Sequence, residues 1–112
     1  MANKQHKDLT GTDLHIMLGT WEDKTSSYGA QQATTDGLVV ANCNFNATSG
    51  YLYFYTDATS NPTTKIQEVL APALSGTDIL GFTCPVKKND YWKITVSGGV
   101  TMLSCYWIPI GS

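Results

Sequence analysis

The sequence contains no arginine. All seven of its basic side chains are lysines, and with nine acidic residues the formal net charge is −2. Arginine is the residue that binds phosphate and guanine in a bidentate manner. A negative chain also has no general attraction to nucleic acids, whose affinity for proteins depends largely on lysine and arginine. We therefore expect no nucleic-acid partner.

Charged residues of either sign are scarce. They make up 14% of the chain, against roughly 25% in typical globular proteins. Serine, threonine, asparagine and glutamine must therefore provide most of the polar surface. Together with the many β-branched and aromatic residues, this composition favours strands and turns over helices.

Long apolar runs are also missing. No segment approaches the ~20 apolar residues that span a bilayer, and residues 1–20 lack the apolar core of a signal peptide. We expect a protein that is made in the cytoplasm and has no membrane partner. Cys43, Cys84 and Cys105 are odd in number and widely spaced, which argues against a disulfide framework and predicts reduced, buried thiols.

No motif indicates catalysis. His6 and His15 both lie near the N-terminus, and no local motif brings a nucleophile or an acid to either of them. The cysteines fall on separate predicted strands, so a zinc site is not expected. Gly98 and Gly99 lack the strand-to-helix context of a phosphate-binding loop. We predict a protein that is not an enzyme and has no metal or cofactor. A small hydrolase is the alternative, and only scattered carboxylates support it: Glu22, Asp57, Glu68 and Asp90.

Alternation of apolar and polar residues begins at Leu38. It predicts strands at residues 38–45, 51–56, 79–86, 91–96 and 100–110. We expect residues 38–45 and 51–56 to form one antiparallel hairpin and residues 79–86 and 91–96 to form another. The apolar sets that should face the core include Val39, Ala41, Cys43, Phe45, Leu80, Phe82, Cys84, Val86, Trp92, Ile94 and Val96.

Two segments are less clear. Residues 21–36 have the composition of turns. Residues 65–74 fit a short helix, because Ile66, Val69 and Leu70 have helical spacing and Thr64 with Gln67 resembles a capping box. A strand is the alternative for this segment, and both interpretations stay open.

The chain is long enough for one core. We predict a polar, extended N-terminal arm at residues 1–20 and an all-β domain at residues 21–112 with the antiparallel β-sandwich or jelly-roll-like fold. The apolar residues of the arm are too few to bury themselves. We therefore expect them to contact the domain or a partner; they are Leu9, Leu14, Ile16, Met17 and Leu18.

The second candidate partner surface is a row of tyrosines. Tyr51, Tyr53 and Tyr55 share one face of a predicted strand, and Leu52 and Phe54 share the other. Three roles are open for the tyrosines. They could contact a partner subunit, pack inside the sandwich or stack on sugar rings.

Three runs resemble small virion proteins of tailed bacteriophages. Residues 6–15 read HKDLTGTDLH, similar to an H-x-x-L-T-G-x-D-L-H opening of such proteins. Residues 85–94, PVKKNDYWKI, and 106–111, YWIPIG, are similar to the P-V-K-K-G-D-Y-W-K-V and W-I-P-L-G ending of tail-fibre tips and decoration proteins. Residues 35–40 add a weaker match to a D-G-F-V-V strand. Asn89 stands where this pattern has glycine, and Ile16 and Met17 replace an E-P-K that often follows the opening.

The resemblance implies a jelly-roll-like fold and a place in the phage particle. We expect a capsid decoration or staple protein on the capsid exterior, which binds the major capsid protein shell and stabilises it. A lattice of symmetric joints suggests a homo-oligomer, either a dimer or a trimer. The alternative is a tail-fibre or receptor-binding tip that recognises cell-surface glycan.

Overall fold

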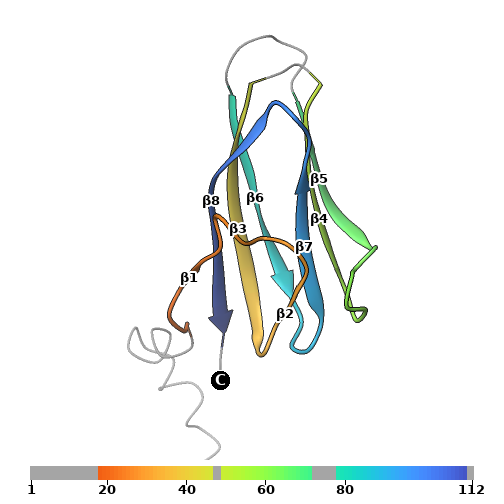
Figure 1. Ribbon diagram of the computed structural model, residues 1–112. Helices are drawn as coiled ribbons and strands as arrows, with labels where there is room; N and C mark the ends of the chain where they lie inside the picture. The colour runs from red at the N-terminus through yellow and green to blue at the C-terminus, as the bar shows by residue number, and fades with distance from the viewer. Residues whose placement is uncertain (1–17, 47–48, 72–77, 111–112) are drawn as a thin grey trace, which may run out of the picture.

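A computed structural model describes residues 18–46, 49–71 and 78–110, and these residues form an all-β structure (Figure 1). No helix among them is long and apolar enough to cross a membrane. Residues 65–70 are a strand, so the helical alternative is wrong for them, and residues 72–74 lie outside the description. The strands are β1 Glu22–Asp23, β2 Gln31–Gln32, β3 Asp36–Phe45, β4 Tyr51–Asp57, β5 Lys65–Leu70, β6 Asp78–Val86, β7 Tyr91–Val96 and β8 Val100–Ile110.

The strands form two antiparallel four-stranded sheets. Sheet A has the order β1-β8-β3-β6, and sheet B has the order β2-β7-β4-β5. Strand pairing is nested, because β4 pairs with β5, β3 with β6, β2 with β7 and β1 with β8. A long hairpin folded over itself in this way is a jelly roll. The predicted β-sandwich with jelly-roll-like topology is therefore confirmed.

Both predicted hairpins are wrong. β3 pairs with β6 and β8, whereas β4 pairs with β5 and β7. The chain therefore passes from one sheet to the other at residues 46–50 and again at residues 87–90. Four residues span up to about 13 Å, and packed sheets lie about 10 Å apart. A turn short enough for a hairpin is thus also long enough to change sheets.

The core lies between the sheets, and both contribute aromatic rings. Trp92 of β7 and Trp107 of β8 stack across the interior with ring centroids 6.4 Å apart and planes at 14°. The three cysteines are buried and free, as predicted, and burial raises the pKa of Cys43 and Cys84 to about 11 and that of Cys105 to about 12. The predicted core residues that are buried are Val39, Ala41, Cys43, Phe45, Cys84, Val86, Trp92 and Ile94, while Leu80, Phe82 and Val96 are partly buried against them.

The segment with turn-like composition crosses one open side of the sandwich. β1 lies against β8, and the chain then passes over to β2 on β7 (Figure 1). Two backbone hydrogen bonds fix this crossing, because Lys24 donates its N–H to the carbonyl of Cys105 at 2.7 Å and Ile94 donates to the carbonyl of Tyr28 at 3.0 Å. The crossing thus connects both sheets on that side.

Candidate functional site

The tyrosine row lies on the outer face of sheet B. Leu52 and Phe54 are fully buried, so the alternation of β4 directs Tyr51, Tyr53 and Tyr55 away from the core. The interpretation that the tyrosines pack inside the sandwich is therefore excluded. All three are partly exposed. We call Tyr51, Tyr53 and Tyr55 the tyrosine ladder.

The rings of the ladder contact one another. Tyr51 and Tyr53 are stacked, with centroids 4.2 Å apart and planes at 16°. Tyr55 meets Tyr53 edge to face, at 6.3 Å and 80°. The edge-to-face pair has a favourable aromatic geometry, and the stacked pair is slightly closer than the usual range of about 4.5–7 Å. The three rings therefore form one continuous row of contacts.

Two lysines from the neighbouring strands extend the ladder. The ammonium of Lys65 on β5 lies 3.9 Å from the centroid of Tyr53, and that of Lys93 on β7 lies 5.0 Å from the centroid of Tyr55. Lys65 also pairs with Glu68 at 3.2 Å, and the hydrogen bond with this carboxylate raises the pKa of Lys65 above its usual value. Lys93 donates to the side-chain oxygen of Asn61 at 2.9 Å. Both cations are thus held over the rings.

This geometry favours protein contact over sugar stacking. A sugar stacks on an open aromatic face, but one face of Tyr51 and one of Tyr53 cover each other, and Lys65 lies over the ring of Tyr53. Ring edges and partly exposed surface remain for a partner. Tyrosine side chains also lose little conformational entropy on binding, because they have only two rotatable torsions.

Sequence reasoning missed the charged members of this surface. Alternation along residues 91–96 places Lys93 on the face opposite Trp92 and Ile94, but it does not reveal that β4 lies beside β7. Lys65 and Glu68 belong to the segment whose structure was ambiguous. If this segment is assigned as a strand that pairs Tyr53 with Glu68, the charged side chains are placed beside the tyrosines.

The candidate contact residues of the arm are only partly described. Leu18 is 48% exposed and forms a bridge with Ile110 at the end of β8. Gly19 donates its N–H to the carbonyl of Pro109 at 2.8 Å. Four of the predicted contact residues lie outside the described residues: Leu9, Leu14, Ile16 and Met17. Leu18, the described member of the set, therefore lies at the end of a strand of sheet A and not on the tyrosine ladder of sheet B.

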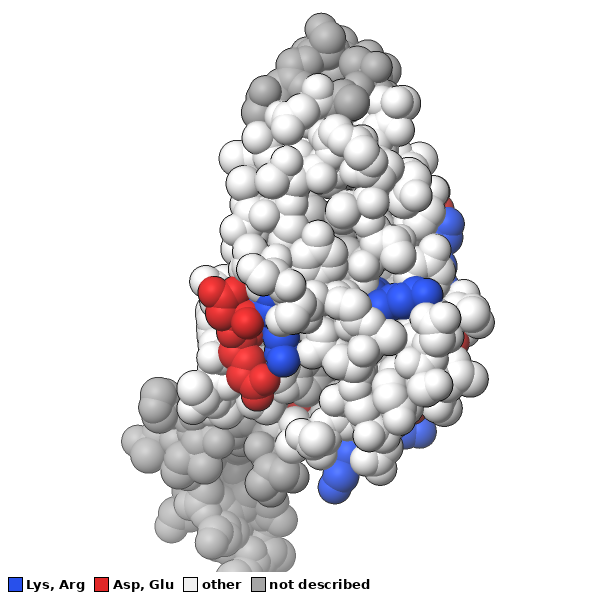
Figure 2. Space-filling model, in the orientation of Figure 1, with Lys and Arg blue, Asp and Glu red and all other residues white. Residues whose placement is uncertain are grey.

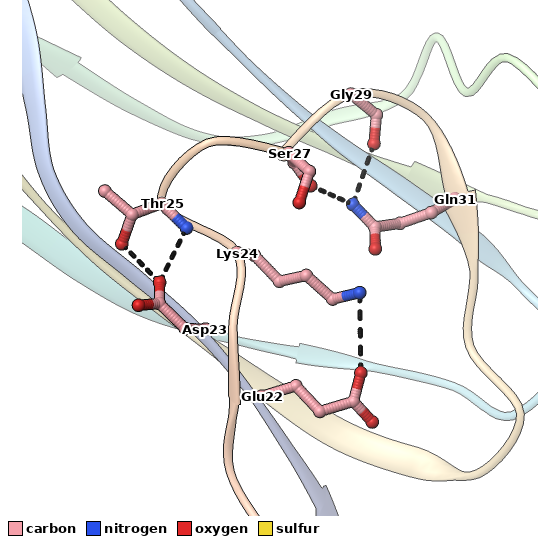
Figure 3. A network of polar contacts seen from close by, with 7 residues as sticks. All are labelled: Glu22, Asp23, Lys24, Thr25, Ser27, Gly29 and Gln31. Carbon is pink, nitrogen blue, oxygen red and sulfur yellow. Dashed lines mark hydrogen bonds and ion pairs between the residues drawn. The ribbon is translucent and has the colours of Figure 1, made fainter.

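A polar recess of about 210 Å³ lies beneath the crossing from β1 to β2. Glu22 and Lys24 form an ion pair at 3.4 Å on its rim. Gln31 donates to the carbonyls of Ser27 at 2.8 Å and Gly29 at 3.0 Å (Figure 3). These contacts hold the crossing in shape. The lining consists of Glu22, Lys24, Gln31, Gln32, Thr34, Trp92 and Trp107.

Asp23, beside this recess, stabilises the local backbone. It accepts hydrogen bonds from the hydroxyl of Thr25 at 2.6 Å and from its N–H at 2.9 Å (Figure 3). Both bonds favour the ionised form and lower the pKa of Asp23. The hydroxyl of Thr25 in turn accepts from the N–H of Cys105 at 3.1 Å. Asp23 therefore ties the crossing to β8.

Within the described ranges, no group of three histidine, cysteine or carboxylate side chains is placed to hold a metal ion. No family model, no curated protein and no solved structure matches this chain.

Proposed function

We propose that this chain is a structural protein of a tailed-phage virion, a decoration or staple protein that binds the exterior of the major capsid protein shell. The resemblance of residues 6–15, 85–94 and 106–111 supports this assignment. The jelly roll is an architecture found in viral capsid domains, and it also occurs in lectins and other proteins. The assignment therefore needs a surface suited to a protein partner.

The tyrosine ladder is the observation that carries the proposal. It presents three contacting aromatic rings on an inner strand of sheet B, flanked by two lysines. Tyrosine is enriched among the residues that dominate binding energy in protein interfaces. A protein that binds only the assembled shell stabilises that shell by mass action. The ladder is the surface we assign to this contact.

Co-sedimentation tests the proposal. The purified chain is mixed with phage shells that lack it, and the shells are pelleted. We expect the chain to pellet with the shells and Tyr53→Ser to bind at least tenfold more weakly, since this change removes the ring that contacts both other tyrosines and Lys65. The matched control is Tyr106→Ser, a partly exposed tyrosine on the outer face of sheet A. Shells that pellet without the chain would rule out the decoration role.

The second candidate is a receptor-binding tip, and the polar recess favours it. Its rim offers a carboxylate, an ammonium and amide groups above the buried Trp92 and Trp107, and a few convergent polar groups of this kind fix the orientation of a small ligand in a pocket. The purified chain would then bind glycans on an array in the absence of any shell. Lys24→Ala would abolish this binding, and Tyr53→Ser would leave it unchanged.

A further inference from the structure

The edges of the two sheets are not equally protected against pairing with other chains. Sheet A ends in β1 and β6, and sheet B ends in β2 and β5. An edge strand exposes unpaired backbone N–H and C=O groups, and proteins limit pairing there by making such strands short, charged or irregular. β1 and β2 contain two residues each, and both residues of β1 are acidic (Figure 2). These two edges are therefore protected by their length.

The free side of β5 and the exposed part of β8 are protected in other ways. β5 carries the ion pair of Lys65 and Glu68, and its register with β4 is irregular. β8 extends beyond β1 over residues 100–104, where its register with β3 also shifts. Charged side chains and irregular register both hinder the addition of a further strand.

β6 lacks these features. It spans nine residues, Asp78–Val86, and pairs with β3 without a shift in register. Residues 79–86 contain no charged side chain. Ile79, Gly81 and Thr83 are exposed, Ile79 to 64%. Among the described residues, no strand pairs with the side of β6 that faces away from β3. β6 is therefore a long, regular and uncharged edge strand.

Pro85 indicates which backbone groups of β6 are free. Along an antiparallel strand, the N–H and C=O groups of successive residues point to opposite sides. Proline has no N–H, and within a sheet it occupies edge positions where this group would point away from the partner strand. Because the register with β3 is regular, Ile79, Gly81 and Thr83 direct their N–H groups to the same side. We call these three residues the free edge of β6.

We propose that the free edge of β6 pairs with the free edge of a second copy of this chain, antiparallel and about a two-fold axis. Each copy donates the N–H groups of Ile79, Gly81 and Thr83 to backbone carbonyls of the other copy. The two four-stranded A sheets then form one continuous sheet across the axis.

The charges at the two ends of β6 favour a second copy in this orientation. β6 begins at Asp78, and Lys87 and Lys88 follow its last residue. Antiparallel pairing places the acidic start of each strand on the same side as the basic end of the other, whereas parallel pairing would bring like charges together. The residues between these ends carry no charge that could meet its equivalent across the axis. A second copy therefore matches the edge in both length and charge.

Experiments on the purified full chain, with no shell present, test this inference separately from the proposed function. In sedimentation equilibrium the average mass should rise from monomer toward dimer between about 10 μM and 1 mM, because an interface made by one strand pair is small and binds weakly. Over the same range, the amide protons of Ile79, Gly81 and Thr83 should exchange at least tenfold more slowly. Those of Leu80 and Phe82, which point toward β3, should change little.

Substitutions on the free edge provide a second test. Thr83→Pro removes an outward N–H and keeps the pairing with β3, as Pro85 does, so the dimer dissociation constant should rise at least tenfold. Ile79→Lys should have the same effect, since lysine is a common protection of natural edge strands. The matched control is Ile66→Lys, which changes an isoleucine that is 45% exposed on the edge strand β5 of sheet B. This variant should dimerise as the wild type does, and melting curves check that all variants stay folded.

Three results would overturn the inference. The first is a wild-type chain that stays monomeric at the highest concentration. The second is slower exchange at Leu80 and Phe82 to the same degree as at the free edge, and the third is equal weakening by Ile66→Lys. Tyr53→Ser should dimerise normally, because the tyrosine ladder lies on the other sheet. Loss of shell binding and loss of the dimer are therefore distinguishable.

Discussion

At the scale of single residues, the turn from β6 to β7 depends on the backbone of Asn89. Its φ angle is +74°, a left-handed conformation that glycine and asparagine adopt more readily than other residues. The turn is closed by the N–H of Asp90, which donates to the carbonyl of Lys87 at 3.0 Å. Asn89 also donates its N–H to the carbonyl of Ala33 at 2.8 Å. The left-handed Asn89 thus connects the turn between β6 and β7 to the segment between β2 and β3.

Replacing Asn89 tests this dependence. Asn89→Ala should lower the free energy of unfolding by about 1 kcal/mol, because a Cβ without a compensating polar group disfavours positive φ. Asn89→Gly should be neutral or slightly stabilising. Urea denaturation of the three proteins measures both changes. An alanine variant as stable as the wild type would show that the left-handed turn costs nothing.

At the scale of elements, Asp57 organises the connection between β4 and β5. Its carboxylate accepts hydrogen bonds from the N–H groups of Thr59 and Thr63 at 2.9 Å and of Thr64 at 3.0 Å, and also from the hydroxyl of Thr59. These bonds, with the Thr59 hydroxyl foremost, hold the pKa of Asp57 well below its usual value of 3.8. The loop is therefore built around an ionised side chain.

This pKa shift predicts a dependence of stability on pH. Because the folded state lowers the pKa of Asp57, its stabilising effect is complete above the unfolded value of 3.8 and is lost as the pH falls below it. Asp57→Asn should lower the melting temperature at pH 7, and the difference from wild type should shrink toward pH 2. Thermal melts over this range measure it. A constant difference at every pH would contradict the assignment.

The sequence predicted strand positions better than strand neighbours. Alternation from Leu38 onward showed which side of each strand is buried, because burial affects every second residue. It could not show that β3 and β4 belong to different sheets, since the same side chains face the core in either arrangement. The tyrosine row was predicted for the same reason. Lys65 and Lys93 were not predicted to join it, because they come from neighbouring strands. Asn89 was singled out because it stands where the phage-like pattern has glycine.

Residues 18–20 join the sandwich although they were assigned to the arm. Leu18 bridges Ile110, and Gly19 bonds to Pro109. A chain that begins at residue 21 should therefore be less stable than one that begins at residue 18. The loss of one backbone hydrogen bond costs about 1 kcal/mol, which lowers the melting temperature by roughly 4–8 °C in a domain of this size. Calorimetry of the two truncated chains measures it, and equal melting temperatures would contradict this role of residues 18–20.

At the scale of the whole molecule, nested pairing predicts the order in which the strand pairs form during folding. β4 and β5 are joined by a short connection, whereas β1 and β8 pair Glu22 with Trp107 across nearly the whole chain. The entropy lost on closing a loop grows with its length. Sandwiches dominated by such distant pairs fold in milliseconds to seconds. We expect folding in that range, with the β4–β5 pair forming before the β1–β8 pair.

Substitutions of two buried residues test whether the β4–β5 pair or the β1–β8 pair forms first. Leu52 on β4 and Cys105 on β8 are both fully buried. Leu52→Ala should destabilise by about 2–5 kcal/mol and slow folding, because its contacts belong to the inner pair that the transition state has already formed. Cys105→Ala should mainly accelerate unfolding, because the outer pair forms late. Stopped-flow kinetics in urea separate the two rates, and a larger effect of Cys105→Ala on folding would mean that the outer strands meet first.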